Sequence, residues 1–218
     1  MTERFSLKEL NLLTRGSPPS EIALGLIFAQ SALDFLPLVD KAVDWIADEF
    51  ARTPKERQDR SEDGLSIDFV TTLKALGFGA SHDTTVGGHC DIVIEEKFGF
   101  LWLGEAKKHR DYDWLLSGFE QLDKRYTTAT AAQDQGAVII YCFGKRIDQV
   151  MGRWKKHLQA NRSDLDFADD PVNDLGFLTT HTHRRTGRDY TVRHLPISLL
   201  WDPEDNQPDP AKEVIARG

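Results

Sequence analysis

Apolar residues recur at helical spacing in the first third of the chain. Two such stripes lie between about Pro19 and Ala51 with Pro37 between them, so we expect two packed helices that cover one face of a sheet. A third helix is expected from about Glu62 to Leu76, with Gly77 as its stop signal. The apolar residues that define the three stripes are Ile22, Leu26, Ala29 and Leu33, then Val39, Ala42, Val43, Ile46 and Phe50, then Leu65, Phe69, Leu73 and Leu76.

Short apolar runs in the middle of the chain are typical of strands. The runs HCDIVIEE and FLWLGEAK are separated only by Lys97, Phe98 and Gly99, which predicts a β-hairpin. The run GAVIIYCF is continuously apolar, as in a strand that is buried on both faces. A helix over about Asp113 to Ala132 is expected to connect the hairpin to this strand. The order helix, hairpin, helix and strand predicts an α/β fold with a mixed sheet.

The last third of the chain combines a basic helix with a second hairpin. Apolar residues from Ile147 to Leu158 recur at helical spacing, and the acidic stretch SDLDFADDPVND after them is expected to form a loop. The run FLTTHTHRRTGRDYTVRHLPISLLW predicts a β-hairpin with TGR near its tip. We therefore expect a helical accessory region over residues 1–60, one α/β domain over 61–201 and a polar tail over 202–218.

Composition narrows the class of protein. Of the 218 residues, 40% are hydrophobic, which is enough to build a buried core. No apolar run has the length of a membrane span, and the first residues, MTERFSLKEL, lack a secretory signal. We therefore expect a soluble, cytoplasmic protein with no membrane partner. Cys90 and Cys142 fall in predicted strands, which favours reduced core thiols over a disulfide.

The chain is acidic, with 27 Lys and Arg residues against 35 Asp and Glu residues and a formal net charge of −8. This balance argues against a protein that coats nucleic acid nonspecifically. It leaves a nucleic-acid enzyme open, because bound divalent cations offset carboxylates locally.

The first predicted hairpin carries the residues most suited to chemistry. Glu105 and Lys107 are two positions apart on one strand, so they project from the same face of the sheet. If the turn lies at Lys97 to Gly99, Asp91 at the start of the neighbouring strand stands opposite Glu105. Two carboxylates and an amine are then expected to share one site.

A divalent cation resolves the repulsion between these carboxylates. Like charges that face each other on a sheet are destabilising or raise a pKa. The carboxylates of Asp91 and Glu105, with the backbone carbonyl of Ala106, are ligands that Mg²⁺ accepts while it keeps several waters. The competing interpretation takes Lys107 as a solvent-facing strand lysine that pairs with Glu105.

Glu62 adds a third carboxylate. On a helix of 3.6 residues per turn it lies over Leu65 and Phe69, on the side that is expected to face the sheet. Taken alone, Glu62 reads as a first-turn residue that complements the helix dipole. Beside Asp91 and Glu105 we interpret it as part of the same site.

The segment from GGHCD to GEAKK resembles the PD-(D/E)xK nuclease superfamily, also called restriction-endonuclease-like, whose core motif is an Asp followed by Glu-x-Lys. Glu62 ahead of the hairpin and Gln121 in GFEQLDKRY after it match positions that many members carry on the flanking helices. The resemblance spans Glu62 to Phe143. Cys90 stands in place of the proline that gives the family its name, and the spacing from Gln121 to the following Tyr is longer than in one branch of the family.

The resemblance implies a restriction-endonuclease-like core and a nuclease that uses Mg²⁺, with Mn²⁺ as a substitute. Asp91, Glu105, Ala106 and Glu62 would hold one or two ions, Lys107 would orient the attacking hydroxide, and Gln121 would position Lys107 or the scissile phosphate. We expect a DNA endonuclease, with RNA open as a substrate. The family also implies a homodimer or a partner protein, and a role in restriction, repair or antiphage defence.

Basic residues outside this motif are candidates for contacts with a nucleic-acid backbone. They are Arg125 beside Gln121, Arg153, Lys155 and Lys156 in the basic helix, and Arg184, Arg185, Arg188 and Arg193 in the second hairpin. The competing interpretation is a solvated helix face and a hairpin edge that charge protects from aggregation.

Two functional alternatives to a nuclease remain at this point. One is a catalytically inactive subunit that binds nucleic acid or serves in assembly, and the other is a hydrolase of some other phosphate ester. His181 and His183 in THTH lack Cys or carboxylate partners in register, so a packing role is favoured over a metal pair. Trp102, Trp114 and Trp154 are interpreted as packing residues.

Overall fold

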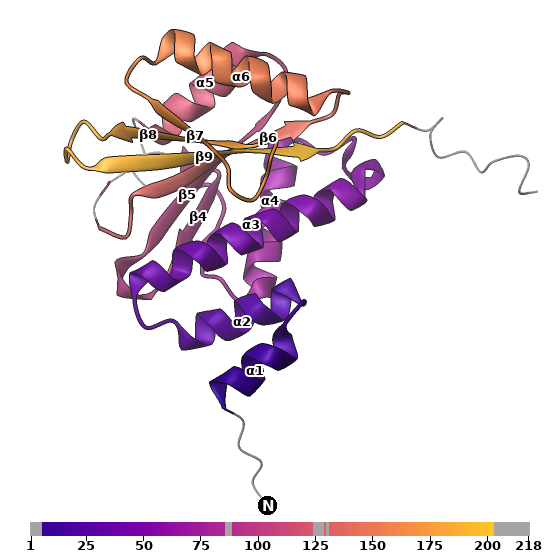
Figure 1. Cartoon of the computed structure of the whole chain (residues 1–218). Coiled ribbons are helices and arrows are strands. Elements are labelled where there is room, and N and C mark those ends of the chain that lie inside the picture. The colour runs from indigo at the N-terminus through magenta and orange to yellow at the C-terminus, as the bar shows by residue number, and fades with distance from the viewer. Residues whose placement is uncertain (1–5, 86–88, 124–128, 130, 203–218) are drawn as a thin grey trace, which may run out of the picture.

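A computed structural model describes residues 6–85, 89–123, 129 and 131–202 (Figure 1). The helices are α1 (Leu7–Thr14), α2 (Pro18–Phe28), α3 (Phe35–Arg52), α4 (Glu62–Leu76), α5 (Tyr112–Gln121) and α6 (Ile147–Asn161), with 3-10 turns at Ala32–Asp34, Pro54–Arg57 and Lys97–Gly99. The strands are β1 (Ala80–Ser81), β2 (Thr84–Thr85), β3 (His89–Cys90), β4 (Ile92–Glu95), β5 (Leu101–Lys108), β6 (Gln135–Cys142), β7 (Asp166–Asp169), β8 (Phe177–Thr182) and β9 (Asp189–Ser198).

Seven strands form one mixed sheet in the order β1-β4-β5-β6-β9-β8-β7, and β2 pairs with β3 separately. The two central pairs, β5 with β6 and β6 with β9, are parallel, and the outer pairs are antiparallel. Helices α3 and α4 cover one face of the sheet, and α5 and α6 cover the other (Figure 1). The predicted α/β class is confirmed. None of the described helices is long and apolar enough to cross a membrane.

The core has two parts, one on each face of the sheet. On β5, Trp102 and Ala106 pack with α3 and α4, while Leu101 and Leu103 pack with α5 and α6. Successive strand residues point to opposite faces, so a strand between two helical layers needs apolar residues at both sets of positions. This requirement explains the apolar run at the start of β5 and the continuous apolar run of β6. Packing on both faces also holds β5 in place up to Ala106, which is buried.

The predicted pairing of the first hairpin is confirmed. Ile92 pairs with Gly104 and Glu95 pairs with Leu101, so Asp91, one residue before β4, stands beside Glu105. Helix α4 has the predicted bounds. The Ser61 hydroxyl accepts the Gly64 N–H at its start, and Gly77 at its end adopts φ 105°, a left-handed conformation that favours glycine.

Three sequence expectations are wrong in their bounds. Pro37 does not separate the first two helices. It lies in the first turn of α3, where its missing N–H has no helical partner to lose, and the break falls before Phe35. Leu33 is therefore 81% exposed and not part of a buried stripe. The acidic segment expected as a loop contains the edge strand β7. Helix α5 ends at Gln121, and much of its expected continuation lies outside the described residues.

Arg193 is not available to a nucleic acid. Its side chain is 8% exposed, and its Nε donates to Asp170 Oδ2 at 2.5 Å while Nη2 donates to Asp44 Oδ1 at 2.6 Å. These contacts join β9 to α3 and to the loop before β8. The sequence pattern of the hairpin does not indicate this burial, because the acidic partners of Arg193 come from segments far away in the chain.

Replacing Arg193 should weaken the fold. The change Arg193→Met leaves the buried carboxylate of Asp170 and the half-buried carboxylate of Asp44 without their cation, which we expect to lower the free energy of unfolding by about 3–5 kcal/mol. Urea denaturation followed by circular dichroism measures the loss. The control Arg153→Met, at an exposed position of α6, should stay within about 0.5 kcal/mol of wild type. Equal stability of the two variants would contradict the prediction.

Candidate functional site

Lys107, near the end of β5, directs its ammonium at three carboxylates. Its Nζ lies 2.6 Å from Glu105 Oε1, 3.4 Å from Glu62 Oε1 and 3.9 Å from Asp91 Oδ2. Lys107 and Glu105 are 4% and 2% exposed. The prediction that these four side chains lie together is confirmed.

A glycine on α5 makes room for the cluster. Glu105 and Lys107 project toward α5, and Gly118 faces them. A Cβ at position 118 would stand 2.9 Å from both Cγ and Cε of Lys107 and 3.4 Å from Cγ of Glu105. A larger residue there would push the lysine away from its partners.

Asp91 lies beside the part of β5 that continues past the end of its pairing with β4. It lies between β3 and β4, and its Oδ2 accepts the backbone N–H of Ala106 at 2.9 Å. The N–H and C=O groups of one strand residue point to the same side. The carbonyl oxygen of Ala106 therefore points toward Asp91, as the predicted metal site requires. His82 supports the loop from behind, with Nδ1 2.8 Å from the backbone oxygen of Asp91.

Glu62, the first residue of α4, joins that helix to β5 and α5. Its Oε2 accepts the backbone N–H of Lys108 at 2.7 Å and the indole N–H of Trp114 at 3.4 Å, while Oε1 faces Lys107. All of these partners are N–H donors. Through these contacts Glu62 stabilises the end of β5. Its role as a metal ligand stays a prediction.

Burial and charge shift the pKa values of the cluster. Burial, followed by the nearby charge of Asp91, raises the pKa of Glu105 to about 7, and burial also raises the pKa of Asp91. Burial alone would lower the pKa of Lys107, but the carboxylates around it more than offset this and raise it. The ammonium therefore stays charged, and one ammonium faces three carboxylates.

The donor set fits a divalent cation held by two carboxylates. Glu105 Oε2 is buried and has no hydrogen-bond partner within the described residues. A buried carboxylate oxygen without a donor suits a cation, and Mg²⁺ in proteins often takes only one or two carboxylates. In the described part of the chain, no three side chains of His, Cys, Asp or Glu are arranged to hold a metal ion together. Asp91, Glu105 and the Ala106 carbonyl are therefore a better candidate set than a cage that includes Glu62.

The other residues predicted for the site are dispersed. Gln121 ends α5, and its side chain makes no hydrogen bond within the described residues, while Arg125 lies outside them. On α6, Arg153 and Lys156 are exposed and Lys155 pairs with Asp169 at 3.4 Å.

The exposed arginines of the second hairpin lie at the opposite end of the sheet from the site. Lys107 pairs with Ile140, which pairs with Pro196 in β9. Arg184, Arg185 and Arg188 precede β9. Arg188, which comes directly before β9, is about 26 Å along the strand from Pro196, the residue of β9 that is level with Lys107. The structure does not bring these residues to the carboxylate cluster.

The sequence analysis missed Trp114 and Arg110 beside the site. The Trp114 ring lies 4.9 Å from Lys107 Nζ and 3.8 Å from the Arg110 guanidinium. Asp111 caps α5 by accepting the Trp114 N–H at 2.7 Å, which fixes Trp114 in the first turn. An Asp cap directly after the strand that ends in Glu-x-Lys was the sequence signal that could have placed Trp114 here.

In the described part of the chain, histidine and cysteine residues take part in no group of three side chains that could hold a metal ion. His181 is buried and its Nε2 lies 2.7 Å from Asp123 Oδ1, in agreement with the packing role that was favoured for it. His89 is exposed and pairs with Asp83 at 2.8 Å. Cys90 and Cys142 are free and buried, as predicted.

Comparisons with known proteins add no assignment. No family model, no curated protein and no solved structure matches this chain. The functional argument therefore depends on the geometry of the carboxylate cluster.

A pair of glycine substitutions tests the fit around Lys107. Gly118→Ala should lower the free energy of unfolding by about 1–3 kcal/mol, because the new methyl overlaps a lysine that its carboxylate partners hold in place. Gly152→Ala on α6 is the matched control. Apart from its chain neighbours and the backbone of its own helix, no atom lies within 4 Å of its Cβ position, so the change should stabilise the protein by about 0.5–1 kcal/mol. Stabilisation by both changes in urea denaturation would contradict the described packing.

The raised pKa of Glu105 predicts how stability depends on pH without metal. Its ordinary value is 4.5 and its value in the folded protein is about 7, so between these values the folded state binds more protons than the unfolded state. Stability is then lost as the pH rises through this window. Relative to wild type, Glu105→Gln should gain on the order of 1–3 kcal/mol from pH 4.5 to pH 8 in EDTA. Parallel curves for the two proteins would contradict the prediction.

Proposed function

We propose that this protein is a metal-dependent nuclease of the PD-(D/E)xK type that hydrolyses phosphodiester bonds in DNA. The observation that carries the proposal is the convergence of Asp91 and Glu105 on Lys107, together with the second oxygen of Glu105, which is buried and has no donor within the described residues. The order of elements also supports a restriction-endonuclease-like core. Helix α4 precedes the β4–β5 hairpin, and α5 connects β5 to the parallel strand β6.

Each residue of the site has its own role in the proposed hydrolysis of a phosphodiester bond. Asp91, Glu105 and the Ala106 carbonyl would hold the cation, which would supply a water of lowered pKa and offset charge on the phosphate. Lys107 orients the attacking water and donates to a phosphate oxygen as negative charge grows on it. Glu62 keeps Lys107 in place through its contacts with Lys108 and Trp114.

Arg110 supplies a contact for the substrate beside the cation. Its side chain is 63% exposed, its Nε lies 3.4 Å from Asp111 Oδ2, and its guanidinium carbon lies over the Trp114 ring, 3.8 Å from the ring centre. A stacked guanidinium is preorganised and presents its N–H donors at its edge, in a fork that matches phosphate oxygens. Trp114 therefore contacts both the guanidinium proposed to bind the substrate and the ammonium of Lys107.

Plasmid cleavage tests the proposal. Purified wild type should nick or cut supercoiled DNA in Mg²⁺ or Mn²⁺, and Asp91→Asn, Glu105→Gln and Lys107→Ala should each lower the rate at least about a hundredfold. Glu62→Gln should lose less, because that residue acts through Lys107. Arg110→Ala should raise KM with little change in kcat, and Arg188→Ala, a matched change at the far end of the sheet, should alter neither.

Two outcomes would overturn the proposal. One is a folded wild type that cuts neither DNA nor RNA in either metal. The other is cleavage at equal rates by the wild type and all three site variants, which would show a contaminating nuclease or a different site.

A noncatalytic subunit is the second candidate. The observation that favours it is the ion pair of 2.6 Å between Lys107 and Glu105, which could serve only to neutralise two charged side chains of β5 that are buried under α5. Such a protein would shift DNA in a gel without nicking it. The orphaned Glu105 Oε2 counts against this candidate, because a purely structural cluster has no use for a buried oxygen without a donor.

A further inference from the structure

Aromatic rings with cations over them lie at the carboxyl ends of three parallel strands. Strands β5, β6 and β9 are neighbours in the sheet, where Lys108 ends β5, Phe143 follows β6 and Trp201 comes shortly after β9. The Nζ atom of Lys108 lies 4.4 Å from the centre of the Phe143 ring, and Nζ of Lys55 lies 5.7 Å from the centre of the Trp201 ring. The rings therefore hold two ammonium groups at the edge of the sheet where ligands bind in open α/β sheets.

The segment 53–61, which joins α3 to α4, lies across this edge. Gln58 Nε2 donates to the backbone oxygen of Leu199 at 2.8 Å, and Nζ of Lys108 donates to the backbone oxygen of Arg60 at 2.9 Å. Figure 1 shows the end of α3 beside the arrowheads of β6 and β9. The segment adds its own cations to the edge. Together they form a basic row that consists of Lys55 and Arg60, which are exposed, and Arg57 and Lys108, which are half-buried.

Most cations of the basic row have no carboxylate partner. In the described part of the chain, Arg60 is the one member that forms an ion pair, with Asp68 at 3.5 Å. Two other members donate to backbone carbonyl oxygens instead. The exposed carboxylates of the same segment, Glu56 and Asp59, form no described ion pair with the row. The charge of the row is therefore available to an anion.

The basic row begins at the candidate site. Lys108 directly follows Lys107 in β5, and its backbone N–H donates to Glu62 Oε2 at 2.7 Å. We propose that the basic row binds the phosphate backbone of the DNA strand that is cleaved, and so positions the scissile phosphate at Lys107. This inference rests on the proposed function, because it assigns a substrate surface to that site.

The length and the chemistry of the row fit one strand of DNA. Adjacent strands of a sheet lie about 4.8 Å apart, so the ends of β5, β6 and β9 span about 10 Å. At about 3.4 Å per phosphate, this is the length of about three phosphates of one DNA strand. The two lysines cover the ring faces, so the row presents cations to phosphates rather than rings to bases. Phosphate contacts position DNA without reading its sequence.

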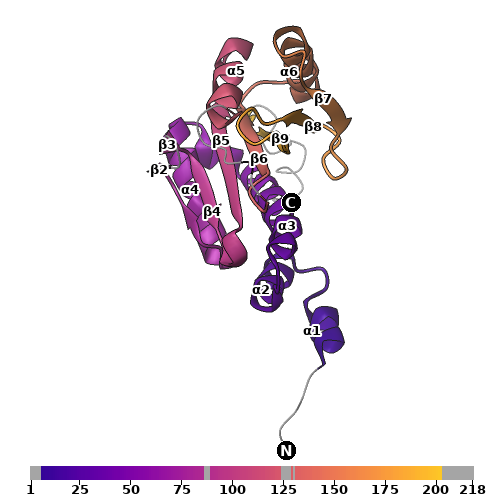
Figure 2. The ribbon, with the colours of Figure 1, turned by 90° about the vertical axis from the view of Figure 1, so that its left-hand side faces the viewer.

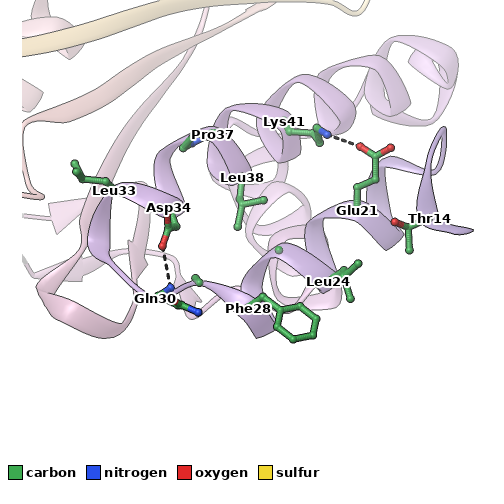
Figure 3. A pocket seen from close by; sticks show the side chains of 12 residues that line it. Thr14, Glu21, Leu24, Phe28, Gln30, Leu33, Asp34, Pro37, Leu38 and Lys41 are labelled. Carbon is green, nitrogen blue, oxygen red and sulfur yellow. Dashed lines mark hydrogen bonds and ion pairs between the residues drawn. The ribbon is translucent and has the colours of Figure 1, made fainter. Parts of the chain in front are cut away.

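The groove of the N-terminal layer has the opposite charge. Figures 1 and 2 show α1 and α2 at the opposite end of the molecule from α5 and α6. The groove between α2 and α3 has a volume of about 680 Å³ (Figure 3). Its lining residues include two carboxylates, Glu21 and Asp34, and one cation, Lys41, which pairs with Glu21. A groove with a net negative charge does not suit a phosphate backbone.

DNA binding by a variant that does not cleave tests the proposal. Fluorescence anisotropy in Mg²⁺ measures the Kd of Glu105→Gln protein for labelled duplexes of two unrelated sequences over a range of salt concentrations. Near physiological salt, added Lys108→Ala or Lys55→Ala should each raise Kd about fivefold for both sequences, and should lower the slope of log Kd against log salt by about 0.9. The control Lys74→Ala, at an exposed lysine about 18 Å along α4 from Glu62, should change neither value.

The outcomes separate the basic row from a structural role and from the nuclease itself. A row that only complements the C-terminal dipole of α3 would change stability in urea and leave the salt slope unchanged, which would overturn the proposal. A loss of affinity for only one of the two sequences would overturn it too. Weaker binding by the row variants beside a wild type that cuts no DNA would support the row and overturn only the proposed nuclease. Cleavage by the wild type with unchanged binding in the row variants would overturn only the row.

Discussion

One buried ammonium among three carboxylates is the constraint on which the rest of this structure depends. Lys107 neutralises only part of the charge that Glu62, Asp91 and Glu105 bring to it. Backbone N–H groups of Ala106 and Lys108 stabilise two of the carboxylates, yet Glu105 remains buried with one oxygen that has no donor within the described residues. Such an arrangement is costly for stability alone, and the divalent cation of the proposed function would offset that cost.

The fold keeps these groups together by packing β5 from both sides. The two apolar clusters hold the strand between helical layers, and the site lies where the pairing of β4 with β5 ends. Helix α4 brings Glu62 to the end of β5, and Gly118 lets α5 approach without displacing Lys107. Rigid elements therefore supply every described contact of the cluster except that of Asp91, whose loop is tied down by Ala106 and His82.

Local patterns in the sequence were sufficient to predict the centre of the site. The two-residue repeat of a strand placed Glu105 beside Lys107, the short turn set Asp91 opposite Glu105, and helical phase brought Glu62 to the same place. Each of these inferences needs only the geometry of one element or of one tight turn.

What the sequence did not predict depends on how distant elements cross. Trp114 meets Glu62 only because the first turn of α5 and the first residue of α4 both reach the end of β5, from opposite faces of the sheet. The burial of Arg193 requires α3 and the loop before β8 to meet β9. The arginines of the second hairpin lie far from the site because β9 pairs in parallel with β6. No local sequence pattern indicates this pairing.

Locating manganese in crystals of the metal-loaded protein tests the central claim most directly. The account predicts an anomalous scattering peak in contact with the carboxylates of Asp91 and Glu105, and no such peak in the Asp91→Asn variant. A peak elsewhere, or an unchanged peak in that variant, would contradict it.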